Sequence, residues 1–192
     1  MAATTTNFEK HTSKNPLKKF FINNYFNNFL ELISDLKIET VLDAGCGEGF
    51  TLNKLKQNGI GQKYEGIDYS EDAIKLGRKI YPNLDIKKGD IYNLLYKENS
   101  FDLIICTEVL EHLDDPQKAL SDILRVSSRY ILLTVPNEPW FTLFNFTQWG
   151  KDIGHINHWS SFSFQKFIIH NSKFRILRKK HPFPWTMILA EK

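Results

Sequence analysis

Apolar positions along this chain fall into two kinds of block, short runs and longer stretches with helical spacing. The short runs are bounded by turn residues, as is typical of strands in a buried sheet. They span residues 40–44, 63–68, 84–90, 101–107, 129–135, 174–180 and 185–191. The run FDLIICT at 101–107 is almost continuously apolar, which predicts a strand covered on both faces.

The longer stretches repeat their apolar residues every three or four positions, which predicts helices between the strands. They comprise residues 16–37, a helix through Leu52 and Leu55 that stops at Asn58-Gly59, a helix from Ser70 to Pro82, a helix that starts at Asp115-Pro116, and residues 162–170. Ser70 and Asp115 are predicted N-caps.

Alternating strands and helices favour a parallel sheet with helices on both faces. The last two runs are too close in sequence for a crossover, so they can pair only as a hairpin. We therefore predict an α/β fold: a doubly wound, mostly parallel, seven-stranded Rossmann-like sheet with an antiparallel C-terminal hairpin strand.

With 192 residues, 42% of them hydrophobic and 24% charged, the chain has the size and composition of one globular domain, residues 1–192. Residues 1–37 are predicted to form an N-terminal helical cover. Residues 136–159 are predicted to form a substrate lid, because they are too rich in aromatic side chains for a solvated loop. These aromatic residues are Trp140, Phe141, Phe144, Phe146 and Trp149.

The net charge and the cysteine content indicate which binding partners and which cellular compartment to expect. A net charge of +3 argues against nucleic-acid binding, and the basic cluster at 173–181 is predicted to be an exposed strand face. Cys46 and Cys106 have no CxxC partner, which favours a reducing compartment, and we expect a cytoplasmic protein. The polar residues 1–15 and the lack of any apolar run of about 18 residues predict neither a signal peptide nor a membrane span.

The stretch VLDAGCGEGF, residues 41–50, places three glycines directly after the first predicted strand. In an open α/β sheet, ligands bind at the carboxyl ends of the strands, and a glycine turn lets the backbone approach them and presents free amides. A phosphate-binding P-loop requires a Lys-Ser or Lys-Thr pair, which is absent after these glycines. A dinucleotide motif requires glycine at position 50, where this chain has Phe50.

LDAGCGEG resembles the first motif of class I S-adenosylmethionine-dependent methyltransferases, and the resemblance continues along the chain. Asp68 ends the second strand and Asp90-Ile91 follows the third, while CTEVLEHLDDP (106–116) and TVPNEP (134–139) follow later strands. These segments are similar to the small-molecule branch that includes the ubiquinone-biosynthesis O-methyltransferases. The resemblance implies that Asp68 accepts hydrogen bonds from the ribose hydroxyls, and that Asp90 and Ile91 hold the adenine.

The resemblance also implies the cofactor S-adenosylmethionine, with S-adenosylhomocysteine as product. The residues expected to bind it are Lys18, Asp43, Gly45, Cys46, Gly47, Gly49, Asp68, Tyr69, Asp90, Ile91 and Thr107. We expect an enzyme that moves a methyl group to a small-molecule acceptor, at oxygen, by in-line displacement. The sequence leaves the acceptor and the oligomeric state open.

His112 is the candidate catalytic base for a hydroxyl acceptor, because histidine titrates near neutral pH. The alternative is that the EHL histidine only holds its loop in place. Glu108, Glu111 and His112, with His155 or His158, also resemble the divalent-metal set of small-RNA 2′-O-methyltransferases. Against a metal, we expect both glutamates to cap and solvate a helix start.

Three alternatives remain beside the main interpretation. One is an RNA-terminus 2′-O-methyltransferase with a divalent metal, and another is a non-catalytic S-adenosylmethionine-binding protein. The third concerns the N-terminal helix and the lid, which could form a vestibule for an apolar or lipid-like acceptor and contact a membrane surface. The simpler expectation is that the aromatic stripe of that helix packs on the sheet.

Overall fold

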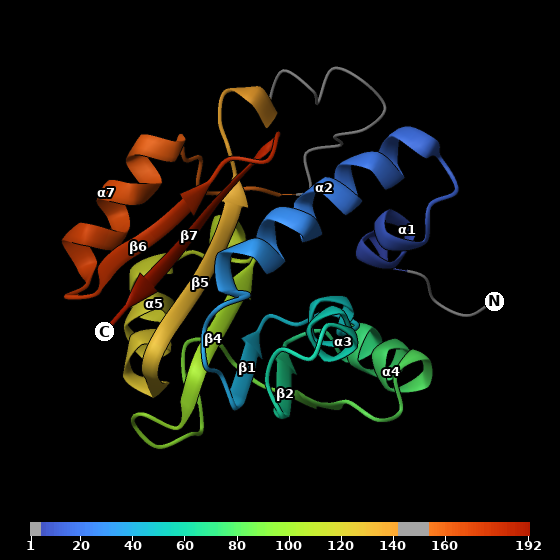
Figure 1. Ribbon diagram of the computed structural model, residues 1–192, viewed down its shortest axis with the longest axis horizontal. Helices are drawn as coiled ribbons and strands as arrows, with labels where there is room; N and C mark the ends of the chain where they lie inside the picture. Colours follow the sequence, from blue (N-terminus) through green and yellow to red (C-terminus); the bar gives the residue numbers. More distant parts are fainter. Residues whose placement is uncertain (1–4, 142–153) are drawn as a thin grey trace.

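The computed structural model describes residues 5–141 and 154–192, and a single seven-stranded sheet lies at its centre (Figure 1). The strands are β1 (Thr40–Ala44), β2 (Lys63–Asp68), β3 (Asp85–Lys88), β4 (Phe101–Thr107), β5 (Ser127–Pro136), β6 (Arg175–Lys180) and β7 (Trp185–Glu191). Their order in the sheet is β3-β2-β1-β4-β5-β7-β6. Strands β1 to β5 pair in parallel, and β7 is antiparallel to both β5 and β6. The predicted fold class is confirmed.

Helices cover both faces of this sheet (Figure 1). They are α1 (Thr6–Thr12), α2 (Pro16–Ile33), α3 (Phe50–Gln57), α4 (Glu71–Ile80), the short 3₁₀ helix η1 (Leu110–His112), α5 (Pro116–Val126) and α7 (Ser161–Asn171). Helices α2, α3 and α4 pack on one face, and η1, α5 and α7 pack on the other. Strand β4 contributes alternate residues to the two cores, Leu103 to the first and Ile104 to the second, as its continuous apolar sequence predicts.

Several element boundaries differ from the sequence-based prediction. Strand β3 spans Asp85–Lys88 rather than 84–90, and its last pairing bond with β2 runs from the Gly89 amide to the Asp68 carbonyl, 3.0 Å away. Helix α2 ends at Ile33 rather than at residue 37. The predicted N-caps are confirmed, since Ser70 accepts from the Ala73 amide at 3.2 Å and Asp115 from the Lys118 amide at 3.0 Å.

Helix α1 was not predicted, because its seven residues carry no apolar period. Its N-cap is Thr5, whose side chain accepts from the Phe8 amide at 3.0 Å. A helix this short is marginal by itself, so its contacts with the rest of the protein must hold it. None of the helices in the described part of the chain has the length and apolar character needed to cross a bilayer.

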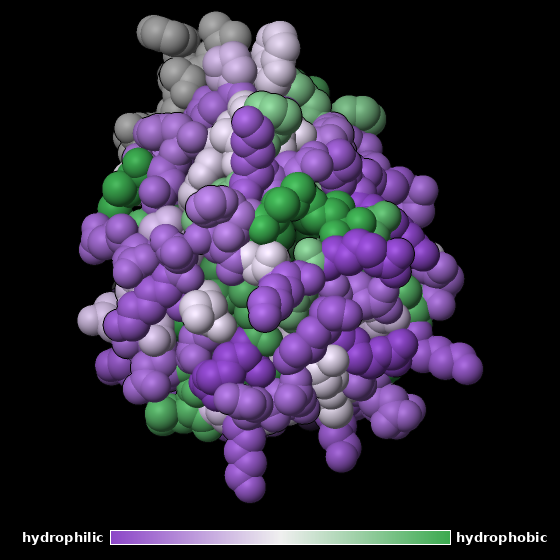
Figure 2. Space-filling view, turned by 90° about the vertical axis from the view of Figure 1, so that its left-hand side faces the viewer, coloured by the Kyte–Doolittle hydropathy of each residue, from purple (hydrophilic) through white to green (hydrophobic). Residues whose placement is uncertain are grey.

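The basic cluster at 173–181 lies on β6, the edge strand of the C-terminal hairpin. Acids from the neighbouring elements pair with its charges: Arg178 with Asp35, Lys180 with Glu31, and Arg175 with Glu191. The face that carries α7 and β6 is mostly hydrophilic, with hydrophobic groups exposed in places (Figure 2). These three ion pairs reduce the net positive charge that the cluster presents.

Candidate active site

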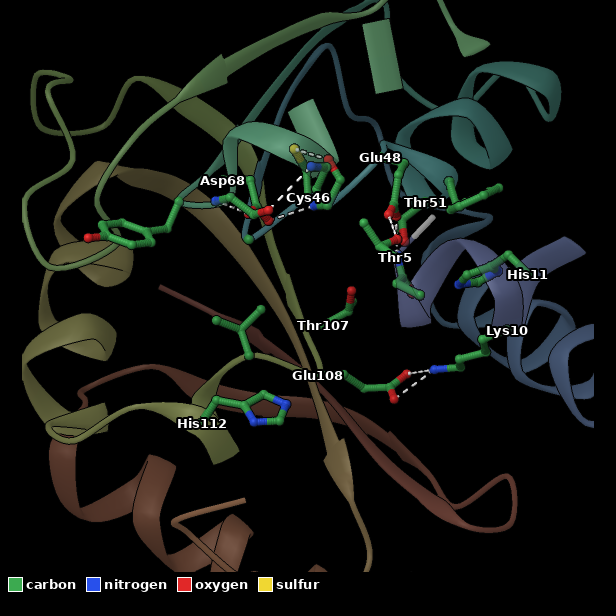
Figure 3. A pocket seen from close by; sticks show the side chains of 18 of the residues that line it. Thr5, Lys10, His11, Cys46, Glu48, Thr51, Asp68, Thr107, Glu108 and His112 are labelled. Atoms are coloured by element: carbon green, nitrogen blue, oxygen red, sulfur yellow. Dashed lines mark hydrogen bonds and ion pairs between the residues drawn. The ribbon is translucent and has the colours of Figure 1, made fainter. Parts of the chain in front are cut away.

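A cavity of about 1150 Å³ lies at the carboxyl ends of the parallel strands (Figure 3). The turn after β1, the segments after β2, β3 and β4, and helices α1 and α2 form its walls. Of the cofactor residues predicted from the sequence, nine line this cavity: Lys18, Gly45, Cys46, Gly47, Asp68, Tyr69, Asp90, Ile91 and Thr107. The candidate base His112 lines it too. Asp43 and Gly49 do not.

The three glycines of the first motif all have positive φ angles, +89° at Gly45, +52° at Gly47 and +85° at Gly49. A Cβ atom on Gly45 would lie 2.3 Å from the Val109 side chain, so this position tolerates no side chain. On Gly49 it would lie 2.7 Å from the side chain of Ile86. Gly49 therefore serves the close packing of α3 against β3, and only the other two glycines shape the cavity wall.

The amides of this turn are engaged within the protein, which corrects the expectation that they are free for a ligand. Gly45 and Cys46 donate to the carbonyl of Ile67 at 2.8 and 2.9 Å, and Gly47 donates to a carboxylate oxygen of Asp68 at 2.7 Å. The other Asp68 oxygen accepts from the Ser70 amide at 2.8 Å. These bonds hold the turn and the Asp68 carboxylate rigidly, with lone pairs of the carboxylate left for a ligand.

Asp43 lies behind the glycine turn as a buried carboxyl group. Within residues 5–141 and 154–192, neither of its side-chain oxygens has a hydrogen-bond partner. Burial, with a smaller contribution from the charge of Asp68, raises the pKa of Asp43 to about 8. A buried carboxyl group without a partner is costly, and a cation bound at the turn would compensate for it. The site therefore fits a positively charged cofactor.

Glu108 follows β4 with an unusual backbone angle, φ +55°, and its carboxylate meets Lys10 of α1 (Figure 3). The Lys10 Nζ lies 2.7 and 2.8 Å from the two carboxylate oxygens. Burial by itself would raise the pKa of Glu108, but the charge and hydrogen bonds of Lys10, together with smaller contributions from Trp185 and His11, outweigh burial and the net pKa is lowered. Glu108 is therefore an ionised, paired group rather than the helix cap predicted from the sequence.

Glu111 is also not the solvated helix-start residue that was expected. Its side chain is 1% exposed, and neither carboxylate oxygen has a partner among the described residues. Burial, and to a smaller extent the charge of Glu108, raises the pKa of Glu111 well above its usual value. The shift disfavours the charged carboxylate, and a cation bound beside it would favour that form.

Two histidines lie beside Glu111. Ligand atoms of Glu111, His112 and His155 all lie within 4.8 Å of one another. The amides of Ile156 and Asn157 donate to the Glu111 carbonyl at 2.8 and 2.9 Å, which holds this segment against η1. The His112 Nδ1 is 3.2 Å from the Gly154 carbonyl. His158 is exposed and is not part of this cluster.

Aromatic side chains form the remaining wall of the cavity. They are Phe21, Tyr25, Phe26, Phe50, Phe141, Phe183 and Trp185. Of the predicted lid aromatics, Phe141 lines the cavity and Trp140 is 52% exposed, whereas Phe144, Phe146 and Trp149 lie outside the described residues. The sequence-based prediction missed the wall residues of α1, among them Lys10. The only local signal for this helix was Thr5 as an N-cap.

Comparison with known proteins identifies the domain. The model of the methyltransferase domain family, Methyltransf_11, matches residues 42–129, from β1 through the start of β5. A probable S-adenosylmethionine-dependent methyltransferase of Mycolicibacterium smegmatis is 32% identical over 104 residues, which cover 53% of this chain and 40% of that protein. Residues 42–129 of this chain are therefore similar to the methyltransferase domain of class I S-adenosylmethionine-dependent enzymes.

Two further similarities were found, one to a curated protein by sequence and one to a solved structure. Norajmaline N-methyltransferase of Rauvolfia serpentina is 34% identical over 99 residues, or 48% of this chain and 33% of that protein. The chain thus spans less than half the length of these curated relatives. The structure of magnesium protoporphyrin IX methyltransferase from Synechocystis PCC 6803 superposes with a TM-score of 0.70, at 18% identity, over 98% of this chain and 95% of that chain. This last similarity concerns the fold alone.

Proposed function

We propose that this protein binds S-adenosylmethionine and transfers its methyl group to an oxygen atom of a small-molecule acceptor by in-line displacement. The carrying observation is the unpartnered Asp43 carboxyl group behind an open glycine turn, because it calls for a cationic ligand there. Bound S-adenosylmethionine supplies a methyl group on a positively charged sulfur, and the protein supplies position and exclusion of water.

Some residues of the cavity would bind the nucleoside end of such a cofactor, and others would bind its amino-acid end. We assign the ribose hydroxyls to Asp68, the adenine to Asp90 and Ile91, and the carboxylate to Lys18 on α2. All four residues line the cavity. Its volume of about 1150 Å³ exceeds the roughly 300–1,000 Å³ of single-ligand pockets, which leaves room for a small acceptor beside the cofactor.

Calorimetry tests the binding step directly. We expect S-adenosylmethionine and S-adenosylhomocysteine to bind, and NADH and ATP not to bind. With a methyl-labelled cofactor and a metabolite extract, we expect label in a small molecule. Binding of NADH or ATP in place of both sulfur nucleosides would contradict the proposal, and tight binding without any turnover would favour a non-catalytic binding protein.

His112 is the group we assign as the base that accepts the hydroxyl proton. Replacing it with alanine should lower kcat by about 10²–10⁴-fold, the range of a positioned base, with little change in cofactor affinity. The matched control is His158→Ala, because His158 is an exposed histidine near the same segment. Unchanged turnover in His112→Ala would remove the base and leave positioning as the protein's contribution.

A divalent cation is a second candidate component of the reaction, favoured by the geometry of Glu111, His112 and His155. Oxygen and imidazole ligands suit such ions, and Glu111 has no partner of its own among the described residues. If the cation orients the acceptor, thorough chelation should lower turnover at least about tenfold, Mg²⁺ or Mn²⁺ should restore it, and Glu111→Gln should prevent the restoration. Activity that survives chelation would exclude this candidate. A metal requirement would not by itself indicate an RNA substrate, since a net charge of +3 offers little attraction for nucleic acid.

The acceptor is proposed to be apolar, since six aromatic rings of the cavity wall lie on α2, the segment around Phe141, the β6–β7 connection and the start of β7. Leu17 and Phe20, 53% and 62% exposed, lie near the cavity on α2 beside Lys19 and could contact a membrane that supplies a lipid-like acceptor. Sedimentation with anionic vesicles at low salt tests this contact. No sedimentation would limit the proposal to a free acceptor.

A further inference from the structure

Helix α1 contacts the same glycine turn that holds the proposed cofactor, although it lies outside the region matched by the family model (Figure 3). Asn7 donates to a carboxylate oxygen of Glu48 at 2.5 Å, and the Thr5 hydroxyl donates to the other. Glu48 lies within the glycine motif and is fully buried. A Cβ atom on Gly47 would lie 3.0 Å from the Asn7 side-chain nitrogen, so α1 is in close contact with the turn.

The other contact of α1 reaches the opposite wall of the cavity. Lys10 pairs with Glu108, which follows β4, and its Nζ lies 5.4 Å from the ring centre of Trp185. Helix α1 therefore bridges the segments after β1 and β4. The N-cap residue Thr5 and four residues of the helix line the cavity: Asn7, Glu9, Lys10 and His11.

His11 packs helix α1 against the aromatic rings of Phe26 and Phe50. Its ring stacks on Phe50 with centres 4.4 Å apart and planes 17° apart, and Phe26 lies 5.7 Å away. Burial is the main cause that lowers the pKa of His11 to about 3, with the nearby Lys10 charge adding to it. The ring is therefore neutral at physiological pH and packs as a flat, uncharged plate.

The ion pair between Lys10 and Glu108 is of the kind that can break and re-form without unfolding the domain. The Lys10 and Glu108 side chains keep 31% and 26% of their surface exposed, and partly exposed ion pairs contribute modestly to stability. Residues 13–15 connect α1 to α2 and are not helical. Segments with few buried apolar contacts open at low free energy.

We propose that α1 is part of the cofactor site and acts as its gate, held shut by the Lys10–Glu108 ion pair. The inference rests on the proposed function, since it concerns exchange of the same cofactor. Lys10 and Glu108 pair with each other and not with the cofactor. The ion pair must therefore break both when the cofactor enters and when it leaves. Breaking it should therefore speed binding and release together.

Stopped-flow fluorescence with S-adenosylhomocysteine tests the gate, because Trp185 beside Lys10 provides a signal. In Lys10→Met we expect the association and dissociation rates to rise together, by about five- to tenfold, with Kd changed less than about twofold. Raising the salt should speed exchange in the wild type more than in Lys10→Met, because salt screens the pair. The matched control is Lys14→Met, which removes an exposed lysine from the α1–α2 connection and should leave both rates unchanged.

The possible outcomes separate the gate from a static wall and from the proposed function. Rates in Lys10→Met equal to those of the wild type would overturn the gate. A faster dissociation alone, with an equal loss of affinity, would overturn it as well and make α1 a fixed binding wall. A wild type that binds no S-adenosylhomocysteine would overturn the proposed function, and the gate with it. Thermal unfolding of Lys10→Met within a few degrees of the wild type confirms that the fold is intact.

Discussion

Gly45→Ala is expected to weaken the binding of S-adenosylmethionine about 100-fold while the protein remains folded. Two costs add at this position. The backbone has φ +89°, which an L side chain adopts only with about 1–3 kcal/mol of strain. The new Cβ would also lie 2.3 and 3.2 Å from the two methyl carbons of Val109, so rotation of the valine cannot relieve the clash.

The clash displaces either the glycine turn or the segment after β4, and both are walls of the cavity. Calorimetry with each sulfur nucleoside measures the loss, and a factor of 100 corresponds to about 2.7 kcal/mol. Gly59→Ala is the control, because Gly59 has φ +66° but no atom within 4 Å of the added Cβ. It carries the same kind of strain outside the site, so it should reduce the thermal stability slightly and leave the affinity unchanged. Equal affinity losses in the two variants would show that the turn is not part of the binding site.

Asp43→Asn should make the cofactor-free protein more stable at pH 8 and bind the cofactor more weakly. Between the unfolded pKa of about 3.9 and the folded pKa of about 8, the native state holds a proton on Asp43 that the unfolded state has lost. Stability therefore falls as pH rises through this range, by up to about 1.4 kcal/mol per pH unit. Asparagine does not titrate, so the stability of Asp43→Asn lacks this dependence on pH.

The measurement is the melting temperature of both proteins between about pH 6.5 and 8. In the wild type, the Asp43 contribution should lower Tm by several degrees across this range, at about 2–4 °C per kcal/mol for a chain of this size. The buried His11 affects stability at lower pH, between about 3 and 6.5, where its pKa is lowered. Glu111 also makes stability fall as pH rises, and it does so equally in both proteins. The difference between the two plots of Tm against pH therefore gives the contribution of Asp43.

Cofactor affinity provides the second readout for Asp43. An ionised Asp43 attracts a cation across the turn, and only S-adenosylmethionine carries the sulfonium charge. We expect Asp43→Asn to bind S-adenosylmethionine about tenfold more weakly, with a smaller loss for S-adenosylhomocysteine. Equal pH slopes in the two proteins, together with unchanged affinity, would contradict the assignment of Asp43 as the buried counter-charge.

Much of the fold was predictable because its signals are local. The almost continuously apolar sequence at 101–107 predicts that strand β4 is buried. Ser70 and Asp115 mark the starts of helices because each caps its own helix with a hydrogen bond. The hairpin of β6 and β7 follows from chain length alone, since nothing long enough for a crossover separates them. Helix α1 gave only one such signal, its N-cap Thr5, because long-range contacts through Lys10 and His11 hold it.

The candidate site was predictable in part, for a related reason. The resemblance to the methyltransferases implied that Asp68, Asp90 and Thr107 bind one cofactor, and all three line the cavity, since parallel strands end at the same edge of the sheet. The prediction that Glu108 and Glu111 cap and solvate a helix start failed, because Glu108 pairs with Lys10 and Glu111 is buried. Gly49 belongs to the motif by its spacing, yet Ile86 of a distant strand explains why it has no side chain.

The sequence by itself determined the order of the elements, the sheet edge at which the site lies and the glycine turn that opens it, since periodicity, capping and φ preferences act over a few neighbouring residues. Only the tertiary structure decided which carboxyl groups are charged. Asp43 and Glu111 are buried without partners, whereas Glu108 meets Lys10 from a segment 98 residues away. Ionisation depends on burial and on distant charges, and these exist only once the chain has folded.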